Sequence, residues 1–307
     1  MARKGICMGN EEESRRSGEM DAIEKGGEKV EGTTQQTQPN AGSSEQSIKK
    51  KLKDLMTDWR ETIKGKEKIK FSDDEKEYFA EEYFCSDGFY PGYFSTENKT
   101  KILFIGREAR YASQKDRVES DIESFKEDVK CVNASSYWRR ILYIAYGIAN
   151  EGCIYSDVPY ASEILNEFLE NDRFNFAIMN ISKYSNDSKN GGKSNWSLIN
   201  RFLKDSDLNI RNFIREEIEL LEPDLIITAN LFNGKIDRTE LEKVFSLTRC
   251  DSIVGKVDLY KVTIKNRTIK LMDTYHFSKP GSDKTLYYEP VMELYKKYFH
   301  SEDSIRS

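Results

Sequence analysis

Short apolar segments that end in polar residues, with helical stretches between them, constrain the fold of this chain more than any other feature. The clearest is KILFIGREARY at 101–111, where four apolar residues are followed by Gly106, Arg107 and Glu108. An apolar run with β-branched residues predicts a buried strand, and a glycine at its end permits a turn or a close approach of the backbone. Charges beyond the carboxyl end of a parallel strand lie where open α/β sheets bind ligands.

Two further apolar segments repeat this pattern, FNFAIMNI at 174–181 and DLIITAN at 224–230. Strands are also predicted at 257–264 and 268–274. Helices are predicted at 47–60, 72–84, 116–130, 135–150, 160–170, 196–203, 208–221, 237–245 and 289–299. Strands separated by helices predict an α/β fold, a three-layer sandwich with a central, mainly parallel sheet flanked by helices.

Composition excludes several classes of protein. No stretch approaches the ~20 apolar residues that span a bilayer, and the N-terminus has no apolar signal-peptide core, so we expect a cytoplasmic protein with no membrane partner. The five cysteines form no CxxC pair, so neither a zinc site nor a disulfide framework is expected. Nucleotide-binding, zinc-protease and nucleophile-elbow motifs are missing from the sequence. We therefore expect no metal and no cofactor.

The charge is unevenly distributed along the chain. Of the net charge of −5, residues 1–46 contribute −3, and they contain no aromatic residue. This composition predicts a disordered tail over 1–46 and a single domain over 47–307. The body is nearly neutral, which argues against a strong non-specific nucleic-acid binder but leaves room for a local basic groove.

Glu108, Asn180 and His276 each follow a predicted strand. Taken singly, they are typical of a surface carboxylate, a turn-forming amide and a structural imidazole. Because the carboxyl ends of parallel strands meet at one edge, the three should face one cleft. There Glu108 could orient water, the Asn180 amide offers a donor and an acceptor, and His276 could donate to a developing anion.

The segment 182–195 predicts a polar loop. It carries Tyr184, three lysines and a Gly-Gly pair. Such a loop could follow a phosphate backbone, or it could simply be solvated.

The order and spacing of these segments resemble the uracil-DNA glycosylase superfamily over roughly residues 85–300. The family's Gly-Gln-Asp-Pro-Tyr-His motif corresponds to GREARY at 106–111. Its strand ending in asparagine corresponds to FAIMN at 176–180, followed by a polar loop and a helix that starts near Trp196. Its last motif, His-Pro-Ser-Pro-Leu-Ser, corresponds to HFSKPG at 276–281.

The resemblance implies a uracil-DNA glycosylase-like fold and a monomeric hydrolase of DNA repair. Such an enzyme cleaves the N-glycosidic bond of uracil or a related damaged or non-standard base after flipping it out of DNA. Glu108 would hold the water, Asn180 would read the base edge and His276 would donate to the base. Substrate contacts are expected from residues of the same motifs and the polar loop: Gly106, Arg107, Arg110, Tyr111, Tyr184, Phe277, Ser278 and Lys279.

Two alternatives remain open from the sequence. The first is a non-catalytic module of the same fold that binds a nucleobase, a nucleotide or DNA, because the first motif departs from the family at Ala109, Arg110 and Tyr111. The second is an unrelated α/β enzyme that holds a small phosphorylated substrate through Arg107, Arg110 and Lys279.

Overall fold

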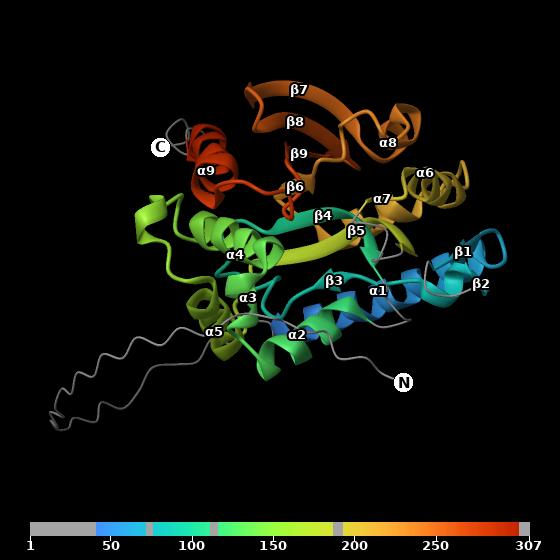
Figure 1. The fold of residues 1–307 in the computed structure, drawn as a ribbon, viewed down its shortest axis with the longest axis horizontal. Coiled ribbons are helices and arrows are strands. Elements are labelled where there is room, and N and C mark those ends of the chain that lie inside the picture. Colours follow the sequence, from blue (N-terminus) through green and yellow to red (C-terminus); the bar gives the residue numbers. More distant parts are fainter. Residues whose placement is uncertain (1–40, 72–75, 111–115, 187–192, 301–307) are drawn as a thin grey trace, which may run out of the picture.

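The computed structural model describes residues 41–71, 76–110, 116–186 and 193–300, which form a large β-sheet with helices against both faces (Figure 1). In this part of the chain the main sheet has seven strands in the order β3-β5-β4-β6-β9-β8-β7. Their bounds are β3 Gly88–Phe89, β4 Ile102–Arg110, β5 Phe176–Asn186, β6 Leu225–Ala229, β7 Ser246–Ile253, β8 Val257–Ile264 and β9 Arg267–Thr274. A separate sheet pairs β1 Lys68–Lys70 with β2 Glu77–Phe79.

The main sheet is mixed, whereas the sequence predicts a mainly parallel one. Strands β5, β4, β6 and β9 are parallel, but β3, β8 and β7 add to the two sides in antiparallel pairs. The sequence does not reveal β7 because this edge strand is largely exposed and has no apolar run. The four parallel strands nevertheless direct their carboxyl ends to one edge, which is the property that the candidate site requires.

Helices cover both faces of this sheet. Side chains of α1, α6, α7 and α8 pack on one face, and those of α2, α3, α4, α5 and α9 pack on the other. Their bounds are α1 Ala41–Ile63, α2 Arg117–Glu127, α3 Cys131–Ala134, α4 Ser136–Ala149, α5 Ala161–Asn171, α6 Trp196–Asp205, α7 Phe213–Leu221, α8 Arg238–Val244 and α9 Glu289–Tyr295. Short 3-10 segments span Ala80–Tyr83 and Tyr155–Asp157, and π-helical segments span Asp283–Tyr288 and Lys296–His300.

Strand β4 shows why the apolar runs predict a central sheet. Leu103 and Ile105 pack in the core on the α1 side, whereas Ile102 and Phe104 pack in the core on the α4 side. Successive side chains of a strand point to opposite faces, so a strand covered on both sides needs a continuous apolar run. The α1 side is anchored by Trp59, which stacks on Phe213 with ring centroids 5.5 Å apart.

Three predicted elements differ in the structure. The helix expected from Ser47 begins at Ala41, and residues 1–40 of the predicted tail lie outside the described residues. Of the helix expected over 72–84, residues 72–75 lie outside the described residues, and the rest contains β2 followed by one 3-10 turn, with Tyr78 and Tyr83 in edge-to-face contact at 5.2 Å. The loop expected from residue 182 is strand through Asn186.

The extension of β5 has a clear physical cause. Lys183 resembles a loop cation in the sequence, but its ammonium is fully buried between the carboxylates of Asp87 and Glu217, at 2.8 and 2.7 Å. Two long-range ion pairs therefore permit a lysine inside a strand, and neither partner can be recognised from the local sequence.

Candidate functional site

Gly106 and Asn180 form the centre of the site at the carboxyl edge of the sheet. They are paired in the parallel register of β4 and β5. A Cβ added to Gly106 would lie 2.5 Å from Asn180 Oδ1, closer than van der Waals contact allows. The glycine thus permits the Asn180 amide to approach β4 closely, as the sequence suggests for a glycine at a strand end.

Asn180 is held firmly at its backbone and incompletely at its side chain. Its N–H donates to Asp87 Oδ2 at 2.5 Å, and the residue is only 3% exposed. Its Nδ2 is buried and, within the described ranges, has no hydrogen-bond partner. A buried donor left without a partner costs about 1–3 kcal/mol, so an acceptor atom of a ligand placed there would recover that free energy.

Ser182 and Glu108 extend the same polar edge. Ser182 is paired with Glu108 in the register of β5 and β4, and its buried Oγ has no hydrogen-bond partner in the part of the chain described. Glu108 is half-buried, and its Oε1 accepts a hydrogen bond from Asn186 Nδ2 at 3.2 Å. The sequence predicts Glu108 and Asn180 here, but Ser182 falls in the segment expected to be a loop.

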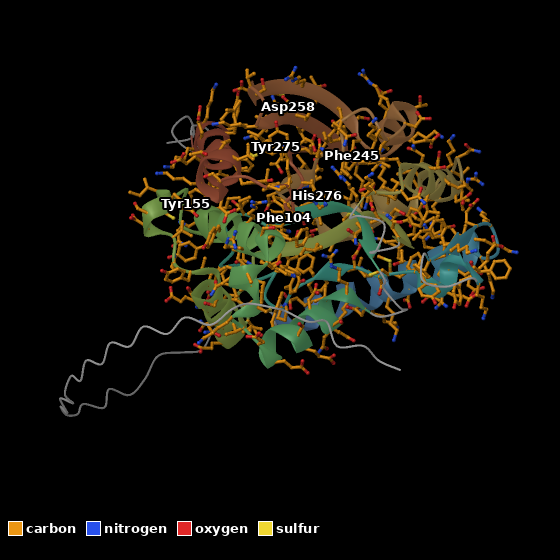
Figure 2. All side chains as sticks on the ribbon, viewed as in Figure 1. Phe104, Tyr155, Phe245, Asp258, Tyr275 and His276 are labelled. Atoms are coloured by element: carbon orange, nitrogen blue, oxygen red, sulfur yellow. The ribbon has the colours of Figure 1, made fainter. Side chains whose placement is uncertain are left out.

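His276 follows β9 by two residues and is labelled in Figure 2 together with Phe104. Its Nδ1 accepts a hydrogen bond from the N–H of Ser278 at 3.2 Å. In a neutral imidazole this assigns the proton to Nε2, which then acts as a donor. The Tyr137 ring lies 6.4 Å from the imidazole between centroids. His276 therefore presents a donor nitrogen beside an aromatic face.

Arg140 fixes the loop that carries His276. This arginine is 3% exposed and donates to the carbonyls of Lys279 and Gly281 at 2.7 and 2.9 Å. Its Nε also contacts Asp283 at 2.6 Å. The loop is thus held through its backbone by a buried guanidinium.

A network around Arg117 connects Asp87, behind Asn180, with Tyr137, beside His276. Arg117 donates to the Tyr137 hydroxyl at 3.2 Å, and its Nη1 lies 3.9 Å from Asp87 Oδ1. Its Nε lies 3.4 Å from Asp121, a carboxyl whose pKa is raised by burial. Sequence reasoning missed this network because residues 116–130 have the composition of a charged surface helix.

The geometry brings Glu108 and Asn180 onto adjacent strands and His276 onto the same edge. Because β6 lies between β4 and β9, His276 starts two strand spacings, roughly 10 Å, from β4. A ligand that contacts all three would extend across β4 and β6, because Asn180 lies on β5.

Two predicted contact residues do not face this edge. Tyr184 is fully buried and packs edge-to-face on Phe202 at 4.7 Å, on the α1 side of the sheet. Phe277 is 1% exposed and packs against Phe104 and Tyr287. Both side chains lie in the core, whereas the sequence predicts that they contact substrate.

The other predicted contacts have mixed outcomes. Arg107 stacks on Trp196 at 4.7 Å, so it braces α6. Lys279 is exposed, with its ammonium 3.1 Å from the centroid of the Tyr275 ring, and Ser278 is also exposed. The side chain of Arg110 and the whole of Tyr111 lie outside the described residues.

Buried charges lie directly behind the site. Asp87 accepts from both Asn180 N–H and Lys183 Nζ, and Lys183 also contacts Glu217. Burial opposes the charge on Lys183, but the two carboxylates outweigh it and raise the pKa of this lysine. Burial raises the pKa of Glu217 to about 7.

Comparisons with known proteins find no match for the chain. No protein-family model matches the chain, and no curated protein matches it significantly. Among the described residues, no helix is both long and apolar enough to cross a bilayer. Within those same ranges, no group of three or more His, Cys, Asp or Glu side chains is placed to hold a metal ion.

Proposed function

We propose that the carboxyl edge of β4, β5 and β9 binds a nucleobase and that the protein is a hydrolase of N-glycosidic bonds in DNA, similar to the uracil-DNA glycosylases. The observation that carries the proposal is Asn180. Its buried Nδ2 has no hydrogen-bond partner among the described residues, and a Cβ at position 106 would lie 2.5 Å from its Oδ1 and force the amide to move. A carbonyl oxygen of a base would supply the missing acceptor.

The remaining groups have the chemistry that the reaction needs. Cleavage of an N-glycosidic bond builds positive charge on the sugar and negative charge on the leaving base. The Glu108 carboxylate lies on β4, opposite Ser182 on the neighbouring strand that carries Asn180, and would hold the attacking water and stabilise the sugar cation. His276 would donate from Nε2 to the base, and one such preorganised donor is worth about 3–4 kcal/mol. The spacing of roughly 10 Å between β4 and β9 leaves room for a nucleoside.

The test is base release from oligonucleotides that carry a panel of modified bases, scored as alkali-labile sites. We expect release by the wild-type protein and none by Glu108→Gln or His276→Ala, with all three proteins folded by circular dichroism. Unchanged rates in both variants would overturn the assignment.

A specific contact favours a second candidate, a binding module of the same architecture that performs no chemistry. Glu108 already accepts a hydrogen bond from Asn186 at 3.2 Å, which is a structural use of the carboxylate. A module of this kind would bind an oligonucleotide containing the recognised base without producing an abasic site. Glu108→Gln would then leave its affinity unchanged, because an amide can keep the contact with Asn186.

A further inference from the structure

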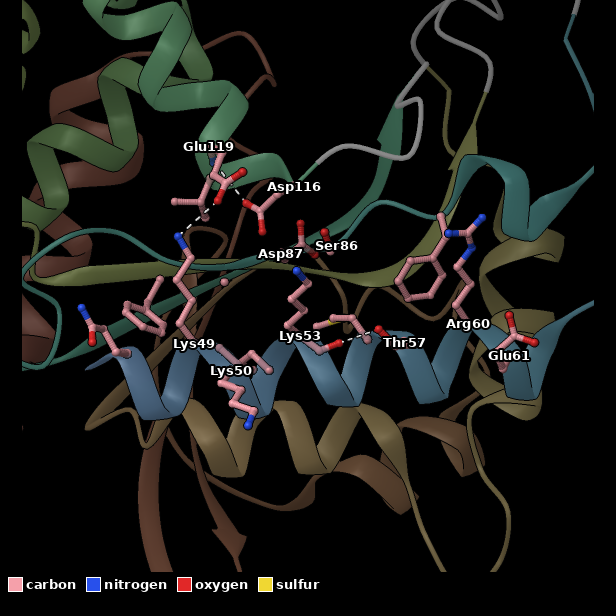
Figure 3. Close-up of a pocket in the computed structure, with 17 residues that line it drawn as sticks. Lys49, Lys50, Lys53, Thr57, Arg60, Glu61, Ser86, Asp87, Asp116 and Glu119 are labelled. Carbon is pink, nitrogen blue, oxygen red and sulfur yellow. Dashed lines mark hydrogen bonds and ion pairs between the residues drawn. The ribbon is translucent and has the colours of Figure 1, made fainter. Parts of the chain in front are cut away.

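A cavity that shares Asp87 with the strand-end site lies between α1 and the segment that leads into β3 (Figure 3). Its volume is about 590 Å³, which is within the range of small-molecule sites. One wall is a face of α1, and the opposite wall is formed by residues 86–89 and 116–119. Leu52, Met56, Phe84, Phe89 and Val118 give it an apolar and aromatic lining.

Each carboxylate of this cavity has at least one partner, although Asp87 Oδ1 makes no hydrogen bond among the described residues. Glu119 pairs with Lys49 at 3.2 Å and Glu61 with Lys64 at 3.1 Å. Asp87 pairs with Lys183 at 2.8 Å. Asp116 accepts the N–H of Glu119 at 3.1 Å as the N-cap of α2.

The α1 wall, in contrast, retains positive charge. The ammonium of Lys53 makes no hydrogen bond or ion pair within the described part of the chain, and Figure 3 shows it directed toward Ser86 and Asp87. Arg60 donates its Nε–H to the Glu81 carbonyl at 3.1 Å, which fixes its guanidinium at the other end of the cavity. Seven residues of helix separate the two cations, roughly 10 Å along the axis. Lys50 points away in the same view.

We propose that this cavity binds a nucleoside monophosphate. Lys53 would contact the phosphate of a monoester, which carries nearly two negative charges at neutral pH, and Arg60 adds positive charge to the same wall about 10 Å along the helix. The aromatic lining suits a planar base. Gln46 and Ser86 supply donors and acceptors for a heterocycle, whereas the Thr57 hydroxyl already donates to the Lys53 carbonyl at 2.8 Å and keeps only its acceptor side.

The experiment is calorimetric titration of the full-length protein with adenosine, uridine and guanosine 5′-monophosphates. Wild-type protein and three variants are compared. Lys53→Ala removes the cation that faces the cavity. Lys51→Ala removes an exposed lysine of the same helix that does not line it. Asn180→Ala tests whether the nucleotide binds in this cavity or at the strand-end site.

We expect at least one nucleotide to bind the wild-type protein saturably. The same nucleotide should bind Lys53→Ala at least about tenfold more weakly, because hydrogen bonds to charged groups are stronger than those between neutral groups. Lys51→Ala and Asn180→Ala should stay within about twofold of wild type. The parent nucleoside and inorganic phosphate should each bind more weakly than the nucleotide. Equal affinities of wild type and Lys53→Ala, loss of binding in Asn180→Ala, or no binding by wild type would each overturn the proposal. Failure here leaves the base-release assay unaffected, since that assay does not depend on Lys53.

Discussion

Asn180 and Lys183 lie three residues apart on β5, and both are buried polar side chains, yet their surroundings differ. The Lys183 ammonium forms ion pairs with two buried carboxylates, Asp87 at 2.8 Å and Glu217 at 2.7 Å. The backbone N–H of Asn180 donates to the same Asp87, but its side-chain Nδ2 makes no hydrogen bond to any described residue. The partners of Lys183 support the fold, whereas the unmade bond of Asn180 Nδ2, at the carboxyl edge of the sheet, would be completed by an acceptor of a ligand.

The comparison predicts the largest loss of stability for Lys183→Met. Removing the cation leaves two carboxylates buried together, and breaking a buried ion pair costs about 3–5 kcal/mol of unfolding free energy. Urea denaturation measures this loss. The exposed Lys51→Met is the matched control and should change stability by less than about 0.5 kcal/mol. A loss below 1 kcal/mol for Lys183→Met would show that the triad is not structural.

Gly106→Ala should destabilise less, by about 1–3 kcal/mol, because its Cβ would lie 2.5 Å from Asn180 Oδ1 and force the amide to move. The double variant Gly106→Ala/Asn180→Ala removes the atom that clashes. Its stability should therefore exceed that of Gly106→Ala alone, and a double-mutant cycle by urea denaturation measures the coupling. Strict additivity would mean that the two side chains do not meet.

Glu217→Gln should change the pH dependence of stability. Burial raises the pKa of Glu217 from 4.5 in the unfolded chain to about 7 in the fold, so the folded state holds its proton more tightly. This contribution is complete below about pH 4.5 and is lost as the pH rises to about 7. Between pH 5 and 8 the wild type should therefore lose about 1 kcal/mol or more relative to Glu217→Gln.

The measurement is the unfolding free energy of both proteins at each pH. Asp273 is a second buried acid, whose pKa is raised by burial to about 6, and it adds its own pH dependence to the stability of both proteins. Subtracting the unfolding free energy of one protein from that of the other at each pH removes this shared contribution. Parallel curves for the two proteins would contradict the assignment.

Asn180→Ala should have the smallest effect on stability, a change under about 1 kcal/mol, because the deleted Nδ2 makes no bond to the described protein. The same change should abolish base release. The unfolding free energy of the variant tests the expected stability, and its rate of base release tests the expected loss of activity. A loss of several kcal/mol would place Asn180 in the same structural class as Lys183.

The sequence predicts much of this arrangement because the parallel strands are marked by local patterns. The runs that become β4 and β6, and the first half of β5, are continuous and apolar, so the edge with Glu108, Asn180 and His276 could be anticipated. Contacts between distant segments could not. Nothing near Lys183 indicates Asp87 or Glu217, so the local sequence predicts a loop there.

The burial of Phe277 also could not be predicted from the sequence. Its position resembles a motif loop, whereas the residues that it packs against, Phe104 and Tyr287, come from other elements. Arg117 and Tyr137 were missed for a similar reason. Each belongs to a helix, and only the fold brings the two together at 3.2 Å beside His276.

The most direct test of the central claim is binding of free nucleobases, uracil first, to the wild-type protein and to Asn180→Ala by calorimetry, with unfolding free energies measured on the same samples. If the unmade bond of Nδ2 is a ligand contact, one base should bind the wild-type protein and bind the variant at least about tenfold more weakly, while the two stabilities agree within about 1 kcal/mol. Equal affinities in two equally stable proteins would contradict the claim.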